Sequence, residues 1–301
     1  MRIFLTGATG FIGARILDEL LSSGHEVLGL TRSDSGAQWL RAKGAEVHRG
    51  SLEDPESLSA GAAEVDAVIH TAFDHDFSRF VENCEKDRRV IEALGSQLNG
   101  SNRPLIITSG TGMGSALPGE KAIENVFNEH SPNPRVASEL AGRKLLDQGV
   151  NVSVVRLPQV HDTMRQGLLT PYIALAQQKG ALAYLDDGMN RVAAAHVLDV
   201  AALYRLALSK AETGACYHAV AEEGVPVRKI AETLGARLSL PVISLPREKA
   251  TEHFGWLGMF IGLDLTASSA LTRERLSWQP VGPELLTDLK RLDISPDETL
   301  P

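Results

Sequence analysis

Cysteine is scarce in this sequence, with only Cys84 and Cys216 among 301 residues. Two cysteines are too few for a disulfide framework, and their separation is not that of a metal-binding motif. The sequence therefore predicts a protein of a reducing, cytoplasmic compartment that has no bound metal.

Positive charge is also in short supply, because 30 Lys and Arg face 38 Asp and Glu, for a net charge of −8. Nucleic acids and anionic membranes attract basic surfaces, so we expect neither as a partner. Long apolar runs are missing too. The longest, residues 254–263, is about half of the roughly 20 residues that a membrane-spanning helix needs. Glycine interrupts the N-terminal segment at Gly7, which argues against a signal peptide.

What the first half does contain is a regular alternation of short apolar runs and longer amphipathic ones. This rhythm predicts an α/β fold, a Rossmann-type doubly wound parallel sheet with helices on both faces. The expected strands are 2–5, 25–30, 45–48, 67–71, 104–108 and 152–157, and the expected helices are 11–21, 35–43, 77–98 and 134–148.

Beyond residue 157 the alternation loosens, with helices expected at 168–179, 197–210 and 227–238 and a late strand at 215–220. We therefore predict two parts. An NADP-binding Rossmann domain comprises residues 1–157 and also uses about 190–220. A smaller C-terminal substrate-binding region comprises residues 158–189 and 221–301.

A glycine-rich turn follows the first predicted strand, in residues 6–13 (TGATGFIG). Gly7 permits a tight turn, Gly10 lets the backbone approach a pyrophosphate, and Gly13 lets the next helix pack closely on the sheet. The N–H groups at the start of that helix then face the phosphates. The turn predicts a dinucleotide site.

The second predicted strand is followed by Arg32 and Ser33. An acidic residue here would bind the ribose 2′-hydroxyl of NAD, whereas an arginine offers a fork of donors to a 2′-phosphate. We therefore expect NADP, as NADPH, to be the cofactor.

These pieces occur in a recognisable order: residues 6–13, 70–72, Ser109, 155–160 and 196–201. With them the chain resembles the extended short-chain dehydrogenase/reductase family of NAD(P)-dependent epimerases, dehydratases and 3β-hydroxysteroid-dehydrogenase-like proteins. The resemblance implies a Rossmann-type domain followed by a smaller substrate domain. Together with the turn and the arginine, it gives the expected cofactor residues, Gly7, Thr9, Gly10, Phe11, Ile12, Gly13, Arg32, Ser33, Leu52, Thr71, Ala72, Phe73, Pro158 and Val160.

The family's tyrosine–lysine pair is missing, because none of the four tyrosines has a lysine four residues later. On the helix that should carry the pair, Arg135 and Glu139 stand at these two positions, around the matching Ser138. Their spacing allows an ion pair on the helix surface, which is our interpretation. The departure points to an atypical branch of the family. Ser109 matches the family's catalytic serine, and Asn83 or Asp87 its asparagine.

Two histidines are candidates for acid–base chemistry or substrate contact. His75 lies between Asp74 and Asp76, where a carboxylate could tune its imidazole, although capping by these aspartates explains the pattern as well. His161 follows the segment expected near the nicotinamide, and the alternative is a loop residue that fills space. His70, at the end of a buried strand, is expected to be structural.

The sequence thus favours an NADP-dependent oxidoreductase that reduces a small carbonyl compound without the usual pair. The alternatives are a non-catalytic NADP-binding redox sensor and an epimerase or dehydratase. Residues 254–263 are either core or an apolar wall over the substrate, which would then be apolar itself. We expect a monomer or a homodimer.

Overall fold

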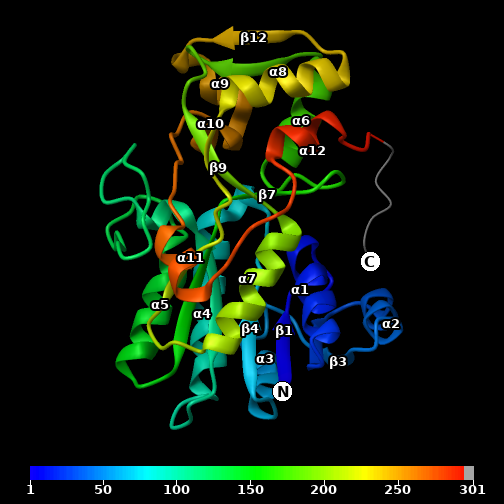
Figure 1. Cartoon of the computed structure of the whole chain (residues 1–301), viewed down its shortest axis with the longest axis vertical. Coiled ribbons are helices and arrows are strands. Elements are labelled where there is room, and N and C mark those ends of the chain that lie inside the picture. Colours follow the sequence, from blue (N-terminus) through cyan, green and yellow to red (C-terminus); the bar gives the residue numbers. More distant parts are fainter. Residues whose placement is uncertain (295–301) are drawn as a thin grey trace.

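A computed structural model gives the structure of the chain and describes residues 1–294. Its centre is a seven-stranded sheet with the order β10-β6-β5-β4-β1-β2-β3, in which every neighbouring pair is parallel (Figure 1). The strands are β1 (Arg2–Thr6), β2 (Glu26–Thr31), β3 (Glu46–Arg49), β4 (Ala67–His70), β5 (Leu105–Gly110), β6 (Val152–Leu157) and β10 (Cys216–His218). The predicted doubly wound parallel sheet is confirmed.

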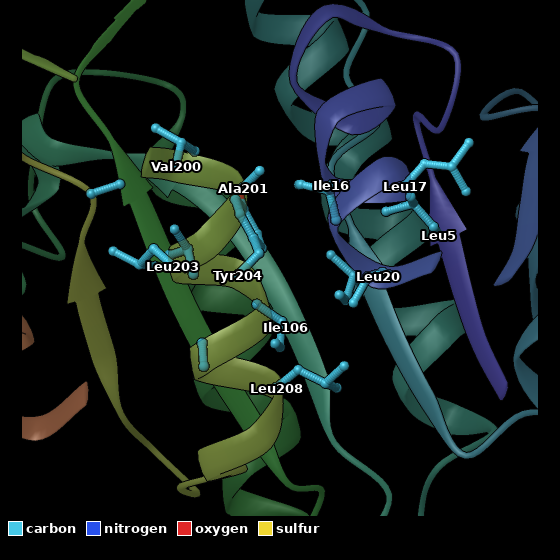
Figure 2. Close-up of a cluster of buried hydrophobic side chains, with 14 of the residues drawn as sticks. Leu5, Ile16, Leu17, Leu20, Ile106, Val200, Ala201, Leu203, Tyr204 and Leu208 are labelled. Carbon is cyan, nitrogen blue, oxygen red and sulfur yellow. The ribbon is translucent and has the colours of Figure 1, made fainter. Parts of the chain in front are cut away.

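Helices cover both faces of this sheet because its strands are apolar on both sides. One core joins β1 and β5 to α1 (Phe11–Ser22), α2 (Asp34–Ala42) and α7 (Val197–Lys210). Figure 2 shows its centre, where Tyr204 and Leu208 of α7 lie with Ile106 of β5 and with Leu20 of α1. The opposite core contains α3 (Pro55–Ala63), α4 (Phe80–Ser96) and α5 (Val136–Asp147).

A second group of elements packs around a hydrophobic core of its own. It contains β9 (Arg191–His196) and β11 (Glu222–Pro226), and β8 (Leu182–Leu185) with β12 (Val242–Leu245) in a two-stranded sheet. β7 (Gln159–His161) pairs with β9 in a small sheet, but its Val160 packs in the core of the central sheet. The helices are α6 (Leu169–Lys179), α8 (Val227–Leu238), α9 (Ala250–Phe254), α10 (Gly258–Ile261) and α12 (Leu285–Lys290). Figure 1 shows most of this group beyond the carboxyl ends of the central strands. α11 (Ala270–Leu276) packs against α7 and β10.

Predicted and observed elements agree where the hydrophobic period is strong, as in α7 and α8, whose bounds match the expected ranges. The helix expected from residue 77 begins instead as a 3-10 turn, η1 (Phe77–Arg79), which Asp76 caps. Three further 3-10 turns are η2 (Thr111–Gly114), η3 (Arg247–Lys249) and η4 (Gly255–Leu257).

The helix α3 was not expected from the sequence, although Asp54 followed by Pro55 is a typical helix start. Residues 295–301 of the predicted substrate-binding region lie outside the described part of the chain. Over residues 1–294, no helix is both long and apolar enough to span a membrane.

Candidate active site

The glycine turn between β1 and α1 has the shape that its spacing predicts. Gly7 has a positive φ of 69°, and its carbonyl accepts a hydrogen bond from the N–H of Gly10 at 2.9 Å. A Cβ on Gly13 would lie 2.0 Å from that same carbonyl oxygen, so only glycine fits there. No side chain of the described part of the chain caps α1, which begins after Gly10. Its first N–H groups are therefore available to a phosphate, so the turn fits a dinucleotide.

Thr6 fastens the loop after β4 to this turn. Its Oγ1 accepts hydrogen bonds from the N–H groups of Thr71 at 3.1 Å and Ala72 at 3.2 Å. The Thr71 hydroxyl donates to the Thr6 carbonyl at 2.7 Å. The structure thus brings Thr71 and Ala72, both expected at the cofactor, against Gly7 of the glycine turn.

Arg32 and Ser33 follow β2 directly. Arg32 is exposed, and within residues 1–294 its guanidinium has no hydrogen bond or ion pair. Ser33 caps α2, where its Oγ accepts the N–H of Gly36 at 3.0 Å. Its own hydroxyl hydrogen remains available for a second partner. Leu52 follows β3, is half-buried and packs against the core beneath α3 and α4.

His70 links this turn to α4 through two buried hydrogen bonds. Thr6 Oγ1 already accepts two N–H groups, so its hydroxyl donates to His70 Nδ1, 2.7 Å away. His70 Nε2 then donates to Asp87 Oδ1 at 3.0 Å. Both nitrogens of the imidazole are therefore occupied, which agrees with the structural role expected for it.

Asp87 binds Arg135 and Ser138, which stand where the resemblance leads us to expect the family's catalytic motif. Its Oδ2 accepts hydrogen bonds from Arg135 Nη1 at 2.6 Å and from the Ser138 hydroxyl at 2.7 Å. Burial alone would raise the pKa of Asp87, but the charge of Arg135 and the hydrogen bonds from His70 and Ser138 hold it at about 2. Asp87 is therefore a carboxylate that fixes the position of Arg135.

Glu139 has a different partner, Arg156 of β6. The guanidinium donates from Nε to Oε1 at 2.8 Å and from Nη2 to Oε2 at 2.7 Å, and both side chains are at least 95% buried. The interpretation of Arg135 and Glu139 as one surface ion pair is therefore wrong. Each residue points into the protein and pairs with a separate strand or helix, which the spacing along α5 could not reveal.

Ser109 lies near the end of β5 and is 4% exposed. Among the described residues its buried Oγ has no hydrogen-bond partner. Buried hydroxyls are rarely left unpaired, so this atom fits an oxygen of a bound molecule. Arg135 Nη2 donates to the carbonyl of Thr108 at 2.9 Å, which puts the guanidinium beside the peptide that leads into Ser109.

An aromatic surface adjoins these polar groups. The guanidinium of Arg135 stacks on Phe73, 4.0 Å from the ring centroid. Phe77 stacks on Trp256 at 4.3 Å with the ring planes 5° apart, and Phe260 packs against both. In residues 254–263, Phe254 belongs to a hydrophobic core, while Trp256 and Phe260 contact Phe77 of the segment after β4. A role of this segment as a wall over a substrate stays a prediction.

The two candidate histidines have very different surroundings. His75 has exposed surface but lies between the rings of Phe73 and Phe77. Desolvation by these neighbours lowers its pKa, and the charge of Arg135 lowers it further. The ring is therefore neutral near pH 7. Asp76, beside it, caps η1, as the alternative interpretation expected for these aspartates.

His161 is completely buried, and its Nδ1 lies 2.8 Å from Asp288 Oδ2 of α12. Desolvation lowers its pKa, although the Asp288 carboxylate acts in the opposite direction. Its buried Nε2, like the Ser109 hydroxyl, has no hydrogen-bond partner among the described residues, so a role of His161 in acid–base chemistry or substrate contact stays a prediction. Val160 before it is buried in the core, and Pro158 is half-buried.

The partner of Glu139 was not predicted from the sequence. Arg156 is a charged residue inside the apolar strand β6, and such a position needs a buried counterion. The need for a counterion could be predicted from the sequence. The identity of the counterion could not, because Glu139 and Arg156 are on different elements.

The model of the NAD dependent epimerase/dehydratase family matches residues 3–221 of the chain. An uncharacterized protein of Schizosaccharomyces pombe is 48% identical over 290 residues, which cover 96% of this chain and 98% of that protein. A 2-alkyl-3-oxoalkanoate reductase of Stenotrophomonas maltophilia is 27% identical over 258 residues, which cover 80% of this chain and 77% of the reductase.

Two solved structures share the fold along nearly the whole chain. The dTDP-glucose 4,6-dehydratase DesIV of Streptomyces venezuelae, with NAD and TYD bound, has a TM-score of 0.76 at 18% identity and covers 97% of this chain and 95% of its own. The human epimerase family protein SDR39U1, with NADPH, has a TM-score of 0.75 at 20% identity and covers 97% and 99%.

Proposed function

Because the chain belongs to the NAD dependent epimerase/dehydratase family, we propose that it is an NADP-dependent oxidoreductase that reduces a small, apolar carbonyl compound without a tyrosine–lysine pair. The observation that carries the proposal is the buried hydroxyl of Ser109 at the carboxyl end of β5, which has no partner among residues 1–294. Open α/β sheets bind their ligands at this edge, where the glycine turn also lies.

In this proposal residues 1–157, with about 190–220, hold the cofactor, and residues 158–189 and 221–301 form the substrate region. The N–H groups after Gly10 bind the pyrophosphate, and Thr71 and Ala72 contact the cofactor beside the glycine turn. When bound, NADPH supplies the hydride that reduces the carbonyl carbon. Ser109 donates a hydrogen bond to the carbonyl oxygen and so orients the substrate.

The preference for NADP rests on Arg32, whose exposed guanidinium has no carboxylate partner among residues 1–294. A 2′-phosphate would receive its donors and the free hydroxyl hydrogen of Ser33. We expect Arg32→Ala to weaken NADPH binding by about tenfold or more, since a hydrogen bond to a charged group contributes ~1.5–3 kcal/mol. NADH binding should hardly change in a fluorescence titration. Equal losses for both would contradict the preference.

An apolar substrate is favoured by Phe73, which lies against the guanidinium of Arg135, and by the stacked rings of Phe77 and Trp256. In the same proposal His75, neutral near pH 7, contacts the substrate from this aromatic side. A cytoplasmic location agrees with the two free cysteines.

The experiment that tests the function follows NADPH absorbance with a panel of aldehydes, ketones and quinones. We expect turnover with at least one compound and a fall in kcat of about 100-fold in Ser109→Ala, because one oriented donor is lost. The second candidate is a redox sensor, favoured by the engagement of both Arg135 and Glu139 in buried ion pairs. NADPH binding without consumption of any compound would favour the sensor and contradict the enzyme.

A further inference from the structure

We propose that Arg135, which stands at the position of the missing tyrosine, is a catalytic residue that donates hydrogen bonds to the reacting oxygen of the substrate. This inference rests on the proposed reductase function. It starts from the position of Arg135, one turn ahead of Glu139 and just before α5, and from what its five N–H groups do.

Three of these N–H groups have partners in the structure. Nη1 donates to Asp87 Oδ2 at 2.6 Å and to Ser138 Oγ at 2.8 Å, and Nη2 donates to the carbonyl of Thr108 at 2.9 Å. Nε and the second hydrogen of Nη2 have no acceptor among residues 1–294. The side chain is 14% exposed, so these two donors are confined but not sealed off.

The guanidinium of Arg135 is also held in one position by its neighbours, unlike that of a solvent-exposed arginine. Phe73 covers one face of its plane at 4.0 Å, and the Asp87 carboxylate anchors one edge. Asp87 in turn is fixed by His70, which is tied to the glycine turn through Thr6. Donors that are oriented before the substrate arrives stabilise developing charge without a cost of reorganisation.

The reduction that this arrangement supports conserves atoms and electrons. The carbonyl carbon gains a hydride from NADPH, and the π-electron pair of the C=O bond becomes a lone pair on oxygen, which turns negative. Arg135 and Ser109 donate hydrogen bonds to that oxygen. Water supplies the proton that completes the alcohol, because a guanidinium keeps its own proton near neutral pH.

The test is the double variant Asp87→Asn/Arg135→Met. The introduced amide can accept from His70 and donate to Ser138, and the introduced thioether side chain can pack on Phe73, so a neutral network replaces the ion pair. We expect kcat to fall about 100-fold. The NADPH dissociation constant and the urea midpoint should stay near those of the unaltered protein.

The matched control is Glu139→Gln/Arg156→Met, which removes the other buried ion pair on the same helix without touching the candidate site. We expect its kcat to be unchanged. If the first double variant is less stable, Arg135→Lys serves instead, since an ammonium still pairs with Asp87 but lacks the fork of donors. We expect about a tenfold loss of kcat there, with NADPH affinity retained.

The outcomes separate the two proposals. If the unaltered protein reduces no carbonyl compound, the proposed function fails and the role of Arg135 fails with it. If it does reduce one, and either Arg135 variant keeps its kcat, only the role of Arg135 is overturned. A loss confined to NADPH affinity also overturns it, because Arg135 would then be a cofactor residue.

Discussion

Replacement of Gly13 by alanine tests how tightly α1 must lie on the glycine turn. The added Cβ would be 2.0 Å from the Gly7 carbonyl oxygen and 2.7 Å from its carbon, both backbone atoms. Real Cβ contacts essentially never fall below 3.0 Å, so the start of α1 has to move by about 1 Å.

The magnitude follows from two opposing contributions. Overpacking against the backbone costs ~1–3 kcal/mol, whereas alanine in a helix is about 1 kcal/mol better than glycine. We therefore expect a net loss of folding stability of up to ~2 kcal/mol. If the first N–H groups of α1 bind the pyrophosphate as proposed, NADPH affinity should fall by about tenfold or more, because they move with the helix.

Gly142→Ala is the matched control, since Gly142 is also a glycine in a helix that faces the sheet. There the new Cβ would meet Cδ1 of Ile107 at 2.7 Å, the far end of a flexible side chain that can turn away. We expect nearly unchanged stability and normal NADPH binding. The assays are urea unfolding followed by circular dichroism and titration by NADPH fluorescence. Gly13→Ala with the stability and affinity of the control would refute the reasoning.

Two further predictions concern His218 and Glu139, two buried side chains that contact Arg156 of β6. Desolvation, with the nearby charge of Arg156, lowers the pKa of His218 to about 3, so this histidine is neutral in the folded protein. Above pH 6.5 His218 is neutral in both the folded and the unfolded chain and does not affect stability. Below pH 6.5 His218 is protonated in the unfolded chain but stays neutral in the folded one, which favours unfolding. From about pH 7 to about pH 5 the folded state therefore loses about 2 kcal/mol, and His218→Asn should remove this loss in urea titrations at the two pH values. If the variant lost as much stability between about pH 7 and about pH 5, His218 would not be the cause. Glu139→Gln alone leaves the charge of Arg156 buried and unpaired, which should cost ~3–5 kcal/mol in urea unfolding, and a loss below about 1 kcal/mol would contradict this account.

Much of the fold could be predicted because its signals are local. The apolar strands, the glycine turn after β1 and the periodic faces of α7 and α8 each lie within a short stretch of sequence. The small sheets around β8 and β11 were missed for the opposite reason. Their strands are short, and their partners are far away in the chain, as in the pairing of β12 with β8.

By itself, the sequence determined the glycine turn, the arginine after β2 and the absence of any tyrosine–lysine pair, since these depend only on which residue stands at which position. The ion-pair partners of Arg135 and Glu139, which stand at the positions of this pair, were decided by the tertiary structure. Arg135 and Glu139 are four residues apart, just before and in the first turn of α5, yet their charges are neutralised by Asp87 of α4 and Arg156 of β6. A buried charge pairs with the countercharge that lies nearest in space, and packing, not spacing along the chain, brings that group to it.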